Sequence, residues 1–277
     1  MDTCGKLQKE CEPFGINVVG IPKTIDNDIA ITDHSPGFGS AARFAAQSIY
    51  EIAQDIRALP IHVSIVETMG RNTGWITAAT ALARTKPGDA PHLIYLSEIP
   101  FNEEQFLSDV KECYDKYGGV VVAVSEGLHD ENGNSIVSPI FQSDRGVYFG
   151  DISSHLAELV IKKLGIKARS EKPGILGRTS SSCQSPVDRE EAVLAGKEAA
   201  KAAIEGKTGI MIGFKRASDD PYKISIVHIP IAQVMLHERT MPPSFISESK
   251  NDVTDEFIQW CKPLIGPIQR NFISFKD

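Results

Sequence analysis

Three clusters of polar side chains in this sequence each follow directly after a short apolar run. In the first cluster, KTIDND at residues 23–28, Asp26 and Asp28 stand two positions apart beside Lys23 and Thr24. Two carboxylates in this setting could deprotonate a hydroxyl group and hold a divalent cation next to phosphate oxygens. The same residues also fit an Asx-type turn, in which an Asp or Asn side chain caps the next segment. The spacing alone leaves both interpretations open.

The second and third clusters offer groups that bind polar ligands. In ETMGRN, residues 67–72, Gly70 lets the backbone approach a ligand closely, and Arg71 offers a planar guanidinium group for phosphate oxygens. In SEGL, residues 125–128, Glu126 could accept hydrogen bonds from a sugar hydroxyl. A solvated Arg and a surface Glu at the ends of buried strands are the alternatives. The shared position of all three clusters after apolar runs favours one common site.

The apolar runs have the length of β-strands, and they are continuous rather than alternating, as expected for strands covered on both faces. They span residues 16–22, 62–66, 92–96, 120–124, 209–214 and 224–229. Segments of helical period lie between several of them, at residues 39–59, 103–117, 151–164 and 188–205. Strands that alternate with helices predict an α/β fold with mainly parallel sheets, in which ligands bind at the carboxyl ends of the strands. The three clusters stand at such ends.

The composition excludes several classes of protein. The chain has 277 residues, 42% hydrophobic and 23% charged, and its net charge of −7 argues against nucleic acid and anionic lipid as partners. No run reaches the roughly 18 apolar residues of a membrane helix, so we expect a cytoplasmic protein with no membrane partner. Five cysteines without a CxxC pair argue against a disulfide framework, and seven histidines without ligand spacing argue against a transition-metal site.

Two further segments carry candidate ligand-binding residues. Arg169 and Arg178 flank KPG at residues 172–174, on a predicted loop and short strand where their guanidinium groups could converge on a phosphate. GFGSAA at residues 37–42 mimics a dinucleotide-binding fingerprint and opens a helix. The preceding residues 29–36 are polar and broken by proline rather than a buried strand, so we interpret this segment as a structural helix start.

The clusters, taken together, resemble the phosphofructokinase family in order and spacing. The motifs that carry the resemblance are PKTIDND at 22–28, MGR at 69–71, SEG at 125–127, KPG at 172–174 leading to Arg178, and RTMPP at 239–243. The resemblance implies that Asp26 takes the proton from the C1 hydroxyl of fructose 6-phosphate, with Thr24 and Asp28 supporting the donor phosphate and Mg²⁺. The residues implied to hold the sugar and its 6-phosphate are Thr24, Ile25, Asp26, Met69, Gly70, Arg71, Glu126, Arg169 and Arg178.

The resemblance also bears on assembly and on the phosphoryl donor. Some phosphate-binding positions of the family are supplied across a subunit interface, so it implies a homo-oligomer, either a dimer or a tetramer. His62 falls where many members carry an Arg that reaches into the neighbouring subunit's site, and a neutral imidazole would weaken that grip. Lys23 stands where pyrophosphate-dependent members have Lys and bacterial ATP-dependent members commonly have Gly. Pyrophosphate is therefore the favoured donor, and ATP is the alternative.

The sequence departs from the family pattern at its N-terminal end. It has neither the Gly-rich loop nor the GGD-type motif that build the donor-phosphate pocket, so it looks like an N-terminally truncated phosphofructokinase. We expect two Rossmann-like three-layer domains, the first incomplete: residues 1–37 and 178–230 as a remnant of the larger donor-side domain, and residues 38–177 and 231–277 as the smaller sugar-phosphate-binding domain.

This departure also predicts a structural weakness. Strands 16–22 and 209–214 would have exposed edges and an uncovered apolar face, which predicts low solubility or dependence on oligomerisation.

A non-catalytic fragment that binds sugar phosphate is the alternative to an enzyme.

Overall fold

The computed structural model describes residues 1–59, 62–143 and 146–272. Its larger sheet is fully parallel. Its strands, in spatial order, are β3 (Leu93–Tyr95), β4 (Val120–Ser125), β2 (Val63–Thr68) and β7 (Ala168–Glu171). β2 and β4 are buried along their whole length and pair in register from Val63 with Val120 to Thr68 with Ser125. Because both strands end at the same level, the residues that follow them, Met69 and Glu126, leave the sheet at the same edge.

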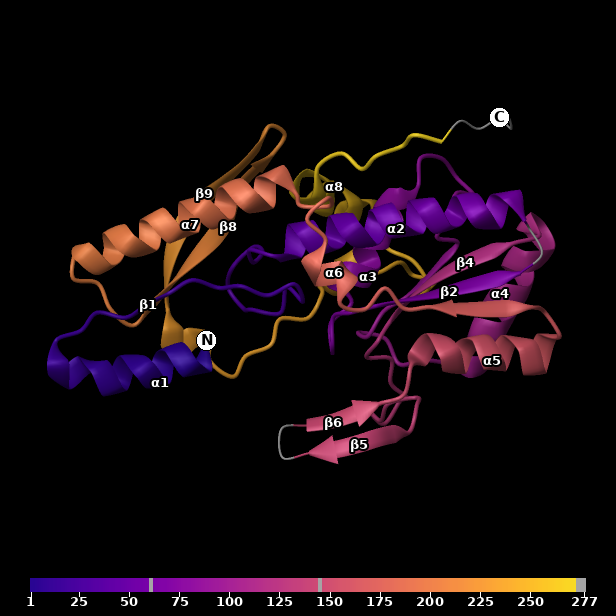
Figure 1. Ribbon diagram of the computed structural model, residues 1–277, viewed down its shortest axis with the longest axis horizontal. Helices are drawn as coiled ribbons and strands as arrows, with labels where there is room; N and C mark the ends of the chain where they lie inside the picture. Colours follow the sequence, from indigo (N-terminus) through magenta and orange to yellow (C-terminus); the bar gives the residue numbers. More distant parts are fainter. Residues whose placement is uncertain (60–61, 144–145, 273–277) are drawn as a thin grey trace.

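Helices pack on both faces of this sheet (Figure 1). One face carries α2 (Phe38–Ala58), α3 (Trp75–Ala79) and α8 (Asp255–Ile265), and the other carries α4 (Glu103–Tyr117) and α5 (Ile152–Leu164). The Ala-rich stripe of α2 is buried against the sheet, which lets the helix approach closely. Asn102 caps the start of α4 by accepting a hydrogen bond from the Gln105 amide, and Gly118 ends it in the left-handed conformation.

The smaller sheet has the order β1 (Val19–Gly20), β8 (Ile210–Asp219) and β9 (Tyr222–Pro230). β1 and β8 are parallel, whereas β8 and β9 form an antiparallel hairpin. α7 (Pro186–Ile204) packs on one face, against Ile212 and Phe214, and α1 (Asp2–Cys11) packs on the other, against Met211.

This arrangement corrects one expectation from the sequence. The segment 209–214 was expected to have an exposed edge and an uncovered apolar face, but it belongs to the central strand, with a neighbour on each side and a helix on each face. Of the strand expected at residues 16–22, the structure forms only the two residues of β1, and the carbonyl of Val18 just before it accepts from the amide of Gly209.

The remaining elements are short. A hairpin of β5 (Pro139–Ser143) and β6 (Gly146–Phe149) projects from the larger sheet's side of the molecule, with Ile140 and Phe141 exposed at 75% and 61% (Figure 1). A one-turn helix, α6 (Leu176–Thr179), follows β7, and single 3-10 turns span Glu12–Phe14, Thr80–Ala83, Ile231–Gln233 and Pro243–Phe245. Over the residues described, none of the helices combines the length and the apolar character needed to cross a bilayer.

The predicted α/β class with mainly parallel strands is confirmed. The four helices expected from periodicity are α2, α4, α5 and α7, each within two residues of its predicted bounds at both ends.

Candidate active site

The loop that carries the acidic pair is fixed by its own backbone and by the second cluster. The Thr24 amide donates to the carbonyl of Pro36 at 3.2 Å, and the Thr24 hydroxyl accepts from the Asp26 amide at 3.1 Å. From the other side, the Thr73 hydroxyl donates to the carbonyl of Asp26 at 2.9 Å. The first polar cluster is therefore joined directly to the loop that follows β2, as the common-site interpretation requires.

The third cluster holds the second in place. One oxygen of Glu126, Oε1, accepts from the amide of Gly70 at 3.1 Å and from the amide of Arg71 at 2.9 Å. Both residues have positive φ, +152° and +52°, so the loop turns sharply and aims its amides at that carboxylate. Gly127 allows the close approach, since a Cβ at this position would lie 1.9 Å from the carbonyl oxygen of Arg71.

Asp26 lies at the centre of the charged groups. Its carboxylate is 14% exposed, and its Oδ2 lies 3.7 Å from Nε of Arg71, a side chain that is 78% exposed. Burial raises the pKa of Asp26, and the negative charges of Asp28 and Glu126 raise it further. The positive charges of Arg71 and Lys23 act in the opposite direction, and the net shift is upward. A carboxylate with a raised pKa is better suited to accept a proton from a hydroxyl.

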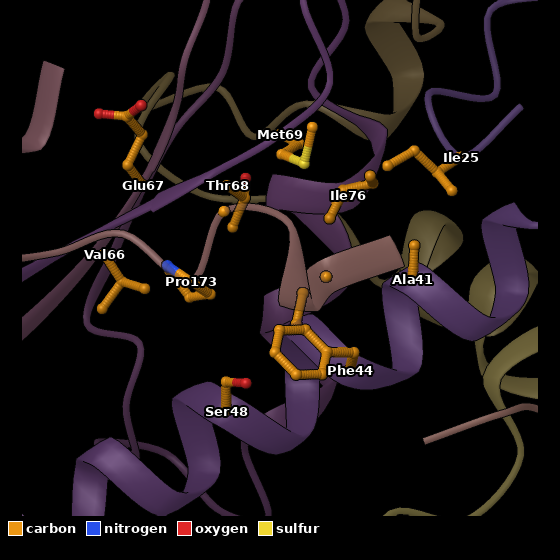
Figure 2. Close-up of a pocket in the computed structure, with 13 residues that line it drawn as sticks. Ile25, Ala41, Phe44, Ser48, Val66, Glu67, Thr68, Met69, Ile76 and Pro173 are labelled. Carbon is orange, nitrogen blue, oxygen red and sulfur yellow. The ribbon is translucent and has the colours of Figure 1, made fainter. Parts of the chain in front are cut away.

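Two of the expected sugar-binding residues point elsewhere. The side chains of Ile25 and Met69 line a small apolar pocket between α2 and the end of β2, together with Phe44 and Ile76 (Figure 2). Pro173, from the loop before α6, closes another side of this pocket. The side chains of Ile25 and Met69 thus belong to this apolar pocket.

The structure separates Arg169 from the acidic cluster. Arg169 lies on β7 opposite Ser64, near the start of β2, whereas the acidic cluster lies beyond the end of β2. At a rise of about 3.3 Å per residue, five residues of strand between Ser64 and Met69 correspond to about 16 Å. Arg178 is exposed on α6. Within the described ranges, no hydrogen bond or ion pair joins either Arg to the acidic cluster.

His62 lies at the same distant end of the sheet as Arg169. It directly precedes β2 and is buried, and burial together with the charges of Arg169 and Lys167 lowers its pKa. Among the residues that the structure describes, its Nδ1 has no hydrogen-bond partner. His62 therefore lies beside Arg169 and Lys167, at the opposite end of β2 from the loop of Arg71.

Two residues without an assigned role in the sequence analysis hold the site together. Glu98, which follows β3, accepts hydrogen bonds from the amides of Gly74 at 3.0 Å and Met241 at 3.1 Å. Arg239 donates its amide to the carbonyl of Asp28 at 2.7 Å, and its guanidinium group stacks over Trp75 at 4.4 Å. The rule that polar residues gather after strand ends applies equally to Glu98, whereas the contact of Arg239 depends on folding across the whole chain.

The acidic pair also bears on metal binding. Across the described portion of the chain, no group of three or more His, Cys, Asp or Glu side chains is arranged to hold a metal ion. Mg²⁺, however, is commonly bound through one or two carboxylates together with substrate phosphates. Asp28, beside Asp26, fits that mode of binding.

The fold and the site define an α/β protein with acidic side chains at the carboxyl ends of its parallel strands. The family model described as Phosphofructokinase matches residues 1–203, and the chain belongs to this family. The family assigned from the motifs is therefore confirmed.

Several known proteins resemble this chain. The pyrophosphate–fructose 6-phosphate 1-phosphotransferase of Rhodospirillum rubrum is 40% identical over 263 residues, which cover 91% of this chain and 64% of the relative. The enzyme of the same name from Xanthomonas campestris pv. campestris is 37% identical over 271 residues, 95% of this chain and 65% of the relative. The crystal structure of a pyrophosphate-dependent phosphofructokinase from Marinobacter aquaeolei superposes with a TM-score of 0.85 at 34% identity, covering all of this chain and 67% of that one. The chain thus spans about two thirds of the length of these relatives.

Proposed function

We propose that this chain takes part in phosphoryl transfer to the C1 hydroxyl of fructose 6-phosphate, giving fructose 1,6-bisphosphate, a step of glycolysis, with pyrophosphate as the favoured donor. The observation that carries the proposal is the placement of Asp26, a largely buried carboxylate of raised pKa facing Arg71 at the carboxyl edge of the sheet. Phosphoryl transfer depends mainly on positioning and on charge neutralisation, so one carboxylate with flanking cations suits it.

Each residue of the site then has a distinct task. Asp26 accepts the proton of the C1 hydroxyl as that oxygen attacks the phosphoryl group, and Thr24 and Lys23 face the donor phosphate. Arg71 and Glu126 hold the sugar, the Arg through its exposed guanidinium group and the Glu by keeping the loop turned toward the ligand. Mg²⁺, bound by Asp28 with phosphate oxygens, would neutralise charge on the donor when present.

Support for pyrophosphate comes from Lys23 and from the relatives. The ammonium group of Lys23 can neutralise a leaving phosphate, and its charge already acts on Asp26. The names of the two curated relatives specify pyrophosphate as donor. ATP remains the alternative donor. The 64% coverage of the Rhodospirillum relative favours, as a second candidate, a sugar-phosphate-binding role without turnover by this chain alone.

A homo-oligomer is part of the proposal. Arg169 lies about 16 Å of strand away from the acidic cluster, and His62, two residues before Ser64, lies farther still. They would serve a sugar phosphate only if it were bound by a second copy. The exposed apolar side chains of the β5–β6 hairpin also favour burial against another subunit. We further propose that residues 1–37 and 178–230 form the donor side, and residues 38–177 and 231–277 the sugar side.

The proposal is tested by incubating the purified chain with fructose 6-phosphate, Mg²⁺ and either pyrophosphate or ATP, and by measuring fructose 1,6-bisphosphate. We expect product with pyrophosphate in excess of product with ATP, and none from an Asp26→Ala control. Binding of fructose 6-phosphate by calorimetry without turnover would favour the second candidate. Absence of both turnover and binding would contradict the proposal.

A further inference from the structure

A buried histidine lies between two carboxylates a short distance along the chain from the acidic pair. His34 is 3% exposed; its Nδ1 lies 2.7 Å from Oδ2 of Asp33, and its Nε2 lies 2.6 Å from Oε2 of Glu191 on α7. A carboxylate only accepts hydrogen bonds, so both ring nitrogens must donate. Burial on its own would lower the pKa of His34, but the hydrogen bonds to the two carboxylates and their charges raise it. His34 is therefore held as the imidazolium ion.

Further hydrogen bonds satisfy the two carboxylates that contact His34. Asp33 also accepts hydrogen bonds from Arg216 of β8 at 3.0 Å and from the indole of Trp260 of α8 at 3.1 Å. The second oxygen of Glu191 accepts from the hydroxyl of Tyr222 of β9 at 2.6 Å. Two cations and two anions thus face one another in a buried space, with each carboxylate satisfied on both oxygens.

The cation of Arg239 extends this network to the acidic loop. Its guanidinium group donates to the carbonyl of Asp33 at 2.6 Å, and its amide donates to the carbonyl of Asp28. The ring of Phe214 on β8 packs against the imidazole with centroids 5.1 Å apart. Residues of four elements, β8, β9, α7 and α8, therefore contact His34 or its two carboxylate partners.

The loop from Asp28 to Gly37 is attached to α7 at two adjacent points. Glu191 holds His34, and Asp188, three residues earlier on the helix, accepts the Gly37 amide at 2.8 Å. Residues three apart on a helix share one face, so both carboxylates point at the loop. The Asp33 amide also donates to the carbonyl of Phe214 at 2.8 Å, which ties the same loop to the smaller sheet.

We propose that His34 is a positioning residue: its contact with Glu191 fixes the acidic loop between α7 and the smaller sheet, and so sets the orientation of Asp26 and Asp28 toward the donor. The catalytic part of this inference rests on the proposed function, but the structural part does not. His34 touches no reacting group and acts through the loop. Removal of its bridge should therefore loosen residues 24–37 and lower turnover more than it weakens binding of the sugar.

The variant His34→Gln removes the charge and one of the two carboxylate contacts, and Glu191→Gln keeps a hydrogen-bond acceptor while removing the charge partner. Tyr222→Phe is the matched control, because it removes a hydrogen bond to the other oxygen of Glu191 and leaves His34 in place. Hydrogen exchange is followed at the amides of Thr24, Ser35 and Gly37, which donate to Pro36, Asn27 and Asp188 respectively. The kcat and the KM for fructose 6-phosphate are measured in parallel.

We expect exchange at these three amides to accelerate at least about tenfold in His34→Gln and Glu191→Gln, with the amides of β2 unchanged and Tyr222→Phe near wild type. Where the wild type turns over, we expect kcat to fall roughly 10- to 100-fold with KM changed less than about threefold. Unchanged exchange in both variants would overturn the inference, as would an equal acceleration throughout the chain. A wild type without turnover or binding of fructose 6-phosphate would contradict the proposed function, while the exchange data would still decide the role of His34.

Discussion

The Nε atom of Arg71 lies 3.7 Å from Oδ2 of Asp26, so an exposed cation at the end of β2 faces a largely buried carboxylate from the loop after β1. Two effects on the pKa of Asp26 oppose each other: burial raises it, and the positive charge of Arg71 lowers it. The protonation state of the proposed base is therefore set by a balance of opposing effects, and single substitutions can shift its pKa in either direction.

Arg71→Met should shift the pKa of Asp26 to a higher value. A general base works in its deprotonated form, so activity rises as the pH rises through the pKa of Asp26. Arg71 lowers that pKa, so its removal moves the acidic limb of the pH–activity profile toward higher pH. The Asp26 carboxyl carbon, titrated by NMR, measures the shift without requiring turnover. Asp28→Asn should move the same pKa downward, because Asp28 raises it; shifts of the same sign in both variants would refute this balance.

Gly127→Ala should distort the loop that carries Arg71. The added Cβ would lie 1.9 Å from the Arg71 carbonyl oxygen, which the backbone cannot tolerate without moving. We expect the free energy of unfolding to fall by about 1–3 kcal/mol and binding of fructose 6-phosphate to weaken. Gly196→Ala is the control, since a Cβ at this position in α7 meets nothing within 4 Å and should stabilise the helix by about 0.5–1 kcal/mol. Equal effects of the two substitutions in a denaturant titration would count against the close approach.

Lys172→Met should destabilise the chain through Glu67. Glu67 is 2% exposed, and its Oε1 lies 2.9 Å from the ammonium group of Lys172, while its Oε2 accepts from the Ser153 amide. Without Lys172 a buried oxygen loses its partner, so we expect the free energy of unfolding to fall by about 1–3 kcal/mol. Adding Glu67→Gln should restore part of the loss by removing the buried charge. Lys162→Met, at an exposed i,i+4 pair, should leave the melting temperature unchanged; a similar loss there would point to a general charge effect.

Lys23→Gly should lower turnover with pyrophosphate more than turnover with ATP. The ammonium group of Lys23 is the cation proposed to neutralise the leaving phosphate, and a full phosphate leaves in the pyrophosphate reaction. Initial rates with each donor at saturating fructose 6-phosphate provide the comparison. An unchanged ratio of the two rates would remove Lys23 as the basis for choosing the donor.

Much of the fold follows from local sequence signals. Buried parallel strands such as β2 and β4 consist of continuous β-branched and other apolar residues, and the amphipathic or Ala-rich period of α2 and α4 marks them as helices. The second and third polar clusters follow β2 and β4, which are neighbours in the larger sheet, whereas the first follows β1 of the smaller sheet and meets them through the contact of Thr73 with Asp26. The features predicted correctly from the sequence are therefore those that depend on local periodicity and on the parallel topology.

The remaining features depend on contacts between distant segments. No local pattern distinguishes the inward side chain of Met69 from the outward one of Arg71, because the positive φ of Gly70 decides it. Arg169 and Arg178 look like one phosphate-binding pair in the sequence, yet the register of β7 against β2 places Arg169 at the far end of the sheet. The network around His34 joins residues from six parts of the chain, so the sequence alone could not reveal it.

The most direct test of the central claim, that Asp26 is the base, is to compare Asp26→Asn with the wild type in both turnover and affinity for fructose 6-phosphate. Asn keeps the size of the side chain and one acceptor oxygen, but its amide cannot accept the proton. We predict that the rate of fructose 1,6-bisphosphate formation falls roughly 10²- to 10⁴-fold while the Kd for fructose 6-phosphate, measured by calorimetry, changes by less than about threefold. Turnover retained in Asp26→Asn, or lost only in proportion to binding, would contradict the account.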